Sequence, residues 1–378
     1  MAGIYVHIPF CKQACTYCDF HFSTSLKLAD RVIDAMIAEI KLRKGEIQTP
    51  LNTIYFGGGT PGILEVEQIE KLLDAIRSNF NINPDAEITL ETNPDDTTQT
   101  KCEGWADLGV NRLSIGIQSF FDQHLSWMNR AHNAAEAKMS LQNAVRSGIT
   151  NLTVDLIYGI PGMSEKDWEE NLSKAIDLGV RHISAYCLTV EPGTALGHFV
   201  KKGKEKPIDE EAASKQFEFM VDYLEEHGIQ QYEVSNFATP GFESRHNSAY
   251  WAGIPYVAIG PSAHGFTGQN RYWNIANNVR YCQSIEDDRL PQTMEMLTPE
   301  ERYNEFIMTG LRTRKGIDLE RVSADFNVDL RQEFKTELKH ILEDGSAKIE
   351  NGILSLTKKG MFLADGIASD FFILSHED

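Results

Sequence analysis

The first two-thirds of the chain alternates short apolar segments with longer amphipathic ones, and this order constrains the fold more than any other feature. Runs rich in β-branched and aromatic residues predict strands at 4–8, 53–56, 87–91, 112–117, 152–157 and 182–188. Helical periodicity predicts helices at 29–43, 66–80, 134–147, 165–178 and 210–227. This alternation is typical of a parallel α/β sheet with right-handed crossovers. Six such units, where eight close a full barrel, predict a partial, TIM-like (β/α)6 barrel.

Three cysteines, Cys11, Cys15 and Cys18, lie just past the first predicted strand, where parallel α/β folds collect their chemistry. An iron–sulfur cluster normally takes four thiolates, so a local triplet leaves one iron open to a small ligand. A zinc site, the weaker alternative, would need a fourth Cys or His nearby. The remaining cysteines are scattered singly and are expected to pack as small apolar side chains; they are Cys102, Cys187 and Cys282.

Glycine-rich and polar segments follow the next predicted strands. Three glycines and Thr60 come after the second strand, where the backbone can approach a ligand closely. Glu91, Gln118, Arg130 and Asp155 lie at or after later strands. An arginine suits the carboxylate of a bound amino acid, and carboxylates suit its ammonium group and the hydroxyls of a ribose. The alternative is that Glu91 and Asp155 are capping or ion-paired residues of the scaffold.

The sequences around these residues resemble those of the oxygen-independent coproporphyrinogen III dehydrogenase superfamily of radical S-adenosylmethionine (SAM) proteins. The shared segments are Tyr-Val-His-Ile-Pro-Phe-Cys, Gly-Gly-Gly-Thr-Pro, Gly-Ile-Gln-Ser-Phe and Asp-Leu-Ile-Tyr-Gly-Ile-Pro-Gly. The resemblance implies that Cys11, Cys15 and Cys18 bind a [4Fe-4S] cluster whose open iron takes SAM. It implies a SAM site formed by Tyr5, Tyr17, Gly58, Gly59, Thr60, Glu91, Gln118, Arg130 and Asp155.

Two departures from the dehydrogenase pattern distinguish the subfamily. The dehydrogenases carry a further cysteine where this chain has Phe20, and an N-terminal extension where this chain begins at its first strand. Instead, the segment from His246 to Tyr250 and Trp251 resembles the His-Asn-x-x-Tyr-Trp signature of HemW-type heme chaperones, which bind heme and pass it to heme-requiring proteins. An imidazole can ligate heme iron, and flat rings can pack on a porphyrin. The alternative is a loop in which His246 and Asn247 bond to the backbone and the aromatic rings pack as core.

The pattern changes again between residues 290 and 299. Helices predicted at 299–312, 319–326 and 330–342 precede a hairpin with an Asn-Gly turn at 351–352. We therefore expect a radical SAM partial barrel at 1–230, a barrel extension with the His-Asn-x-x-Tyr-Trp segment at 231–295, and a small winged-helix-like α+β domain at 296–378. A packing or partner-docking role is expected for the last of these.

Composition limits the partners. A formal net charge of −19 without a basic stripe argues against nucleic acid. The absence of a long apolar run and of a basic leader predicts a cytoplasmic protein. The sequence thus predicts a heme chaperone with a [4Fe-4S] cluster and SAM, which transfers heme to an acceptor such as a respiratory protein. A peripheral membrane-protein contact and a homodimer are further expectations. The alternative is a radical SAM enzyme that oxidatively decarboxylates coproporphyrinogen, and the residues leave enzymatic activity open.

Overall fold

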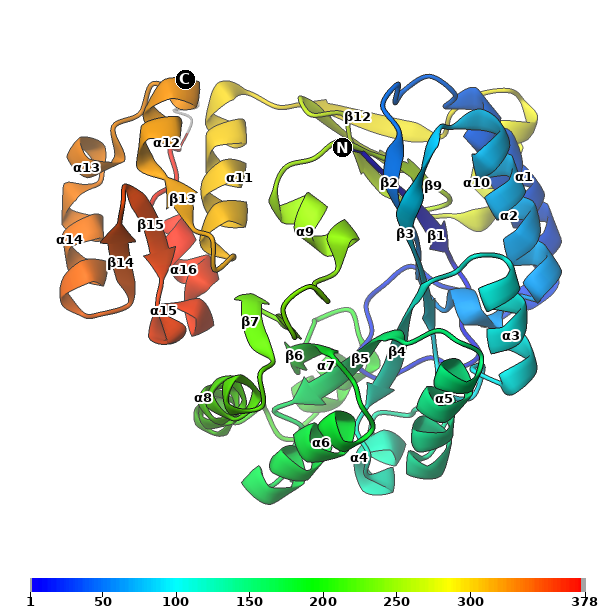
Figure 1. Cartoon of the computed structure of the whole chain (residues 1–378), viewed down its shortest axis with the longest axis horizontal. Coiled ribbons are helices and arrows are strands. Elements are labelled where there is room, and N and C mark those ends of the chain that lie inside the picture. Colours follow the sequence, from blue (N-terminus) through cyan, green and yellow to red (C-terminus); the bar gives the residue numbers. More distant parts are fainter. Residues whose placement is uncertain (1, 375–378) are drawn as a thin grey trace.

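A 12-stranded sheet forms the centre of the computed structural model, which describes residues 2–374 (Figure 1). Six strands pair in parallel and in sequence order: β1 (Gly3–Ile8), β2 (Leu51–Gly58), β3 (Ile82–Thr92), β4 (Arg112–Gln118), β5 (Asn151–Tyr158) and β6 (His182–Cys187). The helices between them are α1 (Ala29–Leu42), α2 (Val66–Asn79), α3 (Gln99–Asp107), α4 (Asp122–Trp127), α5 (Ala134–Arg146) and α6 (Glu165–Asp177). This arrangement confirms the predicted partial barrel.

Both edges of the parallel region are extended. The short strand β9 (Tyr256–Ile259) pairs in parallel with β1, so the parallel region has one strand more than predicted. The sequence did not predict β9 because its four residues, between Pro255 and Gly260, are too few to show the alternating pattern of a strand. The antiparallel strands β10 (His264–Phe266), β11 (Asn270–Asn274) and β12 (Gln292–Met296) continue this edge, and β8 (Asn236–Ala238) and β7 (Gln230–Glu233) continue the other. The nearby helices are α7 (Ala195–Lys201), α8 (Glu210–Glu226), α9 (Arg245–Trp251) and α10 (Asn278–Glu286).

The two faces of the strands differ in chemistry. On β1 the residues Ile4, Val6 and Ile8 are fully buried in the apolar core. The alternating residues Tyr5 and His7 lie on the opposite face, because side chains along a strand alternate between faces. That face lines the lumen of the barrel, where several of the candidate site residues lie.

The C-terminal part forms a separate small sheet, β13-β15-β14, with surrounding helices (Figure 1). The predicted hairpin is confirmed, since Asn351 and Gly352 both have positive φ between its two strands. The helix predicted at 330–342 is two helices, because the chain leaves helical geometry at Phe334, whose ring packs against Phe371. The elements are α11 (Pro299–Leu311), β13 (Ile317–Asp318), α12 (Leu319–Phe326), α13 (Leu330–Glu333), α14 (Lys335–Glu343), β14 (Ala347–Glu350), β15 (Ile353–Leu356), α15 (Lys358–Phe362) and α16 (Ala364–Ser369). Within residues 2–374, no helix has both the length and the apolar character needed to cross a bilayer.

Candidate functional site

The three cysteines of the triplet lie in the loop that follows β1, at the carboxyl end of the sheet. The Cys11 thiol accepts a hydrogen bond from Thr60 Oγ1 at 3.6 Å, and Cys15 Sγ accepts one from Arg130 Nη1 at 3.3 Å. Burial raises the pKa of Cys11 to about 11; the hydrogen bond from Thr60 opposes this rise, and the neighbouring thiols Cys18 and Cys15 add to it. Two of the three thiols are thus hydrogen-bonded to side chains from later parts of the chain.

The triplet suits a cluster better than a single ion. Among the described residues, no three His, Cys, Asp or Glu side chains converge closely enough to hold one metal ion. In an iron–sulfur cluster each thiolate ligates its own iron, so the thiols need only surround the cluster. Phe20, at the position of the further dehydrogenase cysteine, is 67% exposed in the same loop. The donor set therefore fits a [4Fe-4S] cluster with one open iron.

Arg130 lies half-buried between the cysteine loop and the strand ends. Its Nη2 donates to the Gly116 carbonyl at 2.8 Å and to the side chain of Asn93. Its Nη1 lies 3.5 Å from the Tyr17 hydroxyl. Its Nε is buried without a hydrogen-bond partner among the described residues. A guanidinium with an unused, buried donor is suited to a carboxylate ligand.

Glu91 and Asp155 face the lumen from β3 and β5. Glu91 accepts hydrogen bonds from the Tyr55 hydroxyl at 2.6 Å and from the Gly58 N–H at 3.2 Å, while Asp155 accepts one from Ser114 Oγ at 3.2 Å. Burial raises the pKa of Glu91 to about 7 and that of Asp155 to about 6. Neither carboxyl caps a helix or forms an ion pair among the described residues. The structure therefore does not support the alternative that Glu91 and Asp155 are capping or ion-paired residues of the scaffold.

The remaining candidates for the SAM site lie in the same region. Tyr5 bonds to His7 through its hydroxyl, Gly59 packs against the backbone of Phe10, and Gln118 ends β4 with a φ of 62°. The structure thus brings together all nine residues at the carboxyl end and in the lumen. Sequence reasoning missed four polar neighbours; they are Tyr55, Asn93, Ser114 and Ser184. Of these, Asn93 follows Glu91 by two residues, and that spacing was a usable signal because it keeps side chains on one face of a strand.

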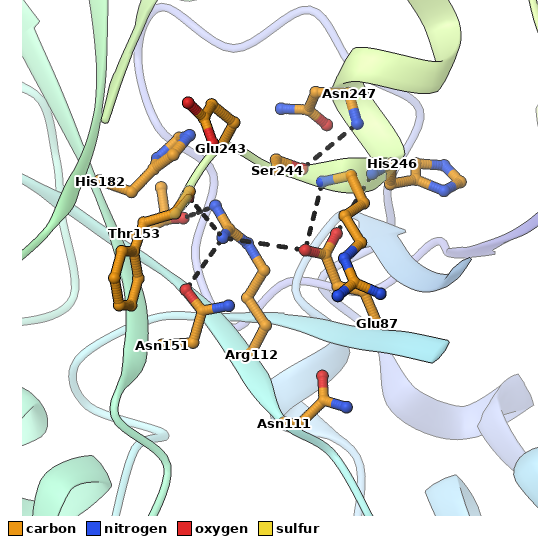
Figure 2. A network of polar contacts seen from close by, with 12 residues as sticks. Glu87, Asn111, Arg112, Asn151, Thr153, His182, Glu243, Ser244, His246 and Asn247 are labelled. Atoms are coloured by element: carbon orange, nitrogen blue, oxygen red, sulfur yellow. Dashed lines mark hydrogen bonds and ion pairs between the residues drawn. The ribbon is translucent and has the colours of Figure 1, made fainter. Parts of the chain in front are cut away.

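The His-Asn-x-x-Tyr-Trp segment forms the helix α9, not a loop, and it lies at the amino end of the barrel (Figures 1 and 2). Ser244 caps this helix by accepting a hydrogen bond from the Asn247 N–H. The imidazole of His246 is 3% exposed, bonds to Thr53 through Nδ1 and stacks on Tyr55 with ring centroids 4.9 Å apart. Tyr250 packs edge-on against His246, and Trp251 is half-buried beneath the guanidinium of Arg312.

A buried polar network holds α9 against the strands (Figure 2). The carboxylate of Glu87 accepts hydrogen bonds from the backbone N–H groups of Arg245 and His246, both at 3.2 Å. Arg112 lies 4.0 Å from Glu87 and donates to Asn151 Oδ1 at 3.0 Å. A polar cavity of about 30 Å³ lies between this network and the candidate SAM site. Its lining includes Glu91, Arg112, Asp155 and Asn247. A cavity of this size holds water.

The chain resembles known proteins along nearly its whole length. The radical SAM superfamily matches residues 5–175, and the HemN C-terminal domain matches residues 297–363. The heme chaperone HemW of Mycobacterium tuberculosis (strain H37Rv) is 35% identical over 97% of this chain and 93% of its own length, and that of Bacillus subtilis is 34% identical over 98% and 99%. The chain belongs to the HemW family of radical SAM proteins. Coproporphyrinogen III oxidase (HemN) of Escherichia coli has the same fold, with a TM-score of 0.84 at 23% identity over 98% of this chain and 90% of that one.

Proposed function

We propose that the protein is a heme chaperone that holds a [4Fe-4S] cluster and SAM, binds heme and transfers it to an acceptor protein. The observation that carries this proposal is the cysteine triplet at the carboxyl end of the barrel, in a chain at least 34% identical to two heme chaperones across nearly their whole length. The proposed cluster ligands are Cys11, Cys15 and Cys18.

The proposed SAM site uses the polar groups of the strand ends. Arg130 would bind the carboxylate of SAM, because its buried Nε is a donor without a partner among the described residues. Glu91 and Asp155 would accept hydrogen bonds from the ammonium group and the ribose, since strand hydroxyl groups hold both carboxyls in place. When bound, the cluster supplies an electron that can cleave the sulfonium bond of SAM. The chain itself orients the ligand and restricts the access of water, because these groups lie partly buried in the lumen.

The proposal extends to heme and to its acceptor protein. His246, Tyr250 and Trp251 stay candidate heme contacts from their signature, although the His246 ring is enclosed in this structure. A respiratory acceptor, a contact with a membrane protein, a homodimer, a cytoplasmic location and the three domain boundaries also remain predictions.

Anaerobic titration with hemin, followed by mixing with an apo heme protein, tests the proposal. We expect stoichiometric hemin binding and the spectrum of the loaded acceptor after mixing. The matched assay supplies coproporphyrinogen, SAM and a reductant, and we expect no protoporphyrinogen. Turnover of coproporphyrinogen without hemin binding would contradict the chaperone function and favour the decarboxylating enzyme.

A further inference from the structure

Tyr55, in the middle of β2, touches a residue of each of two candidate sites. Its hydroxyl donates to Glu91 Oε1 at 2.6 Å, and Glu91 is a candidate SAM residue. Its ring stacks on the imidazole of His246, the candidate heme ligand on α9, with centroids 4.9 Å apart and an interplanar angle of 25°. A single side chain thus connects the SAM site at the carboxyl end of the barrel with the helix at its amino end.

A glycine allows the close packing around Tyr55. Tyr5, another candidate SAM residue, stacks on Tyr55 with centroids 6.1 Å apart and an interplanar angle of 28°. A Cβ added at Gly57 would lie 2.9 Å from both rings and 3.1 Å from Glu91 Oε1. Because Gly57 has no side chain, the two tyrosines and the carboxylate can approach one another.

The imidazole of His246 is closed to a ligand while α9 is docked on the strands. Its Nδ1 lies 2.8 Å from Thr53 Oγ1, and its Nε2 is buried without a partner among the described residues. Axial ligation of heme iron needs a ring nitrogen. Heme ligation by His246 therefore requires a second state, in which α9 has moved away from Thr53 and Tyr55.

Binding of SAM at Glu91 favours the docked state. A cationic ammonium group near Glu91 favours its ionised form, and an ionised carboxylate is the stronger acceptor for the Tyr55 hydroxyl. This bond holds the ring against which His246 stacks. Asn247 of α9 also lines the same polar cavity as Glu91, so displacement of α9 would open that cavity to water.

We infer that Tyr55 couples the two sites, so that SAM binding and heme binding weaken each other. This inference rests on the proposed function, in which His246 ligates heme, and adds its regulation: bound SAM promotes the release of heme. Tyr55 is a positioning residue, because it acts through Glu91 and His246. Coupling between two binding sites is reciprocal, so each ligand changes the affinity of the other by the same factor.

Anaerobic calorimetry of the full chain, loaded with its cluster, tests the inference. Saturating hemin should weaken SAM binding by about fivefold or more, and saturating SAM should weaken hemin binding by the same factor. Tyr55→Phe keeps the ring and removes the hydroxyl that bonds to Glu91, so the factor should fall below about twofold. The matched control is Tyr223→Phe on α8, where the ring stacks on Phe219; it should keep the factor of the unaltered chain.

Hydrogen exchange gives a second measurement, which needs no heme. SAM should slow the exchange of the α9 amides in the unaltered chain and in Tyr223→Phe, and should have no such effect in Tyr55→Phe. Circular dichroism and iron content establish that each variant is folded and holds its cluster.

The outcomes contradict different statements. If both ligands bind but SAM leaves hemin affinity unchanged or strengthens it, the coupling is overturned and the chaperone function stands. Full coupling in Tyr55→Phe, or slowed exchange of its α9 amides by SAM, would show that Tyr55 does not carry the coupling. Failure of the unaltered chain to bind hemin would reject the proposed function itself, and the inference with it.

Discussion

Thr53 Oγ1 lies 2.8 Å from His246 Nδ1 and joins β2 to α9 at the amino end of the barrel. Burial lowers the pKa of His246 to about 3, so the ring stays neutral and can share a single proton with the hydroxyl. Its Nε2 has no hydrogen-bond partner among the described residues. A porphyrin would reach that nitrogen only after α9 moved away from the strands. The hydrogen bond between Thr53 and His246 therefore stabilises the fold, whether or not the His246 ring also binds heme.

Substitutions at this pair should destabilise the protein to different extents. Thr53→Val leaves a buried imidazole nitrogen without its partner and should lower the free energy of unfolding by about 1–3 kcal/mol. His246→Ala also removes a ring stacked on Tyr55, and should cost about 2–5 kcal/mol through the cavity left behind. Urea denaturation measures both changes.

The same two variants separate structure from heme ligation. Thr53→Val keeps the imidazole, so a ligating His246 would retain its heme spectrum in Thr53→Val and lose it in His246→Ala. Because His246 is the candidate heme ligand, we expect the spectrum to persist in folded Thr53→Val and to be lost in folded His246→Ala. Persistence of the spectrum in both variants would show that His246 has a structural role only.

The buried pair of Arg112 and Glu87 should also stabilise the amino end of the barrel, independently of Thr53 and His246. Arg112→Met leaves the Glu87 carboxylate buried without its nearby cation and should lower the free energy of unfolding by about 3–5 kcal/mol. The matched control is Arg245→Met, because Arg245 pairs with Asp85 across 3.7 Å while both side chains are more than half exposed. That variant should change stability by no more than about 1 kcal/mol. Equal effects of the two substitutions in urea denaturation would refute this role for Arg112.

Sequence reasoning identified the elements that carry strong local signals. Buried parallel strands are short, continuous apolar runs, so β4 and β5 could be predicted closely, and their order followed from the alternation with helices. The seven residues of α9 give no usable period, and Glu87, which accepts two of its N–H groups, lies about 160 positions earlier in the chain.

The cysteine triplet should be necessary for the cluster. Replacement of one of three protein ligands removes the attachment of one iron, so Cys15→Ala should abolish the broad iron–sulfur absorbance and the bound sulfide. Cys187→Ala is the control, since Cys187 lies apart from the triplet on β6 and is half-buried. Iron and sulfide are measured in anaerobically purified protein. A full complement in Cys15→Ala would contradict the assignment.

Arg130 should be needed for SAM affinity. Arg130→Gln removes a partly buried cation, and SAM binding should weaken by about 2–5 kcal/mol in calorimetry. Because Arg130 Nη1 also donates to Cys15 Sγ, iron content is measured in parallel; we expect the cluster to remain, since the thiolates hold it. Arg146→Gln, an exposed position on α5, is the matched control. Unchanged SAM affinity would remove Arg130 from the site.

Glu91 should make the stability of the cofactor-free chain depend on pH. Burial raises the pKa of Glu91 to about 7, whereas an unfolded glutamate titrates near about 4.3. Between these values the folded chain keeps a proton that the unfolded chain has released, so the contribution of Glu91 to stability falls as pH rises from about 4.3 to 7. Glu91→Gln is neutral in both states and should remove this part of the slope.

Thermal unfolding of the cofactor-free protein between pH 5 and pH 8 measures this contribution. Relative to the unaltered chain, Glu91→Gln should gain most in Tm at the upper end of the range, where the buried carboxylate is charged in both states. Glu226→Gln, at an exposed position on α8, controls for the loss of a carboxyl elsewhere and should leave the slope unchanged. A parallel slope in Glu91→Gln and the unaltered chain would mean that Tyr55 and the Gly58 N–H stabilise the carboxylate enough to offset its burial.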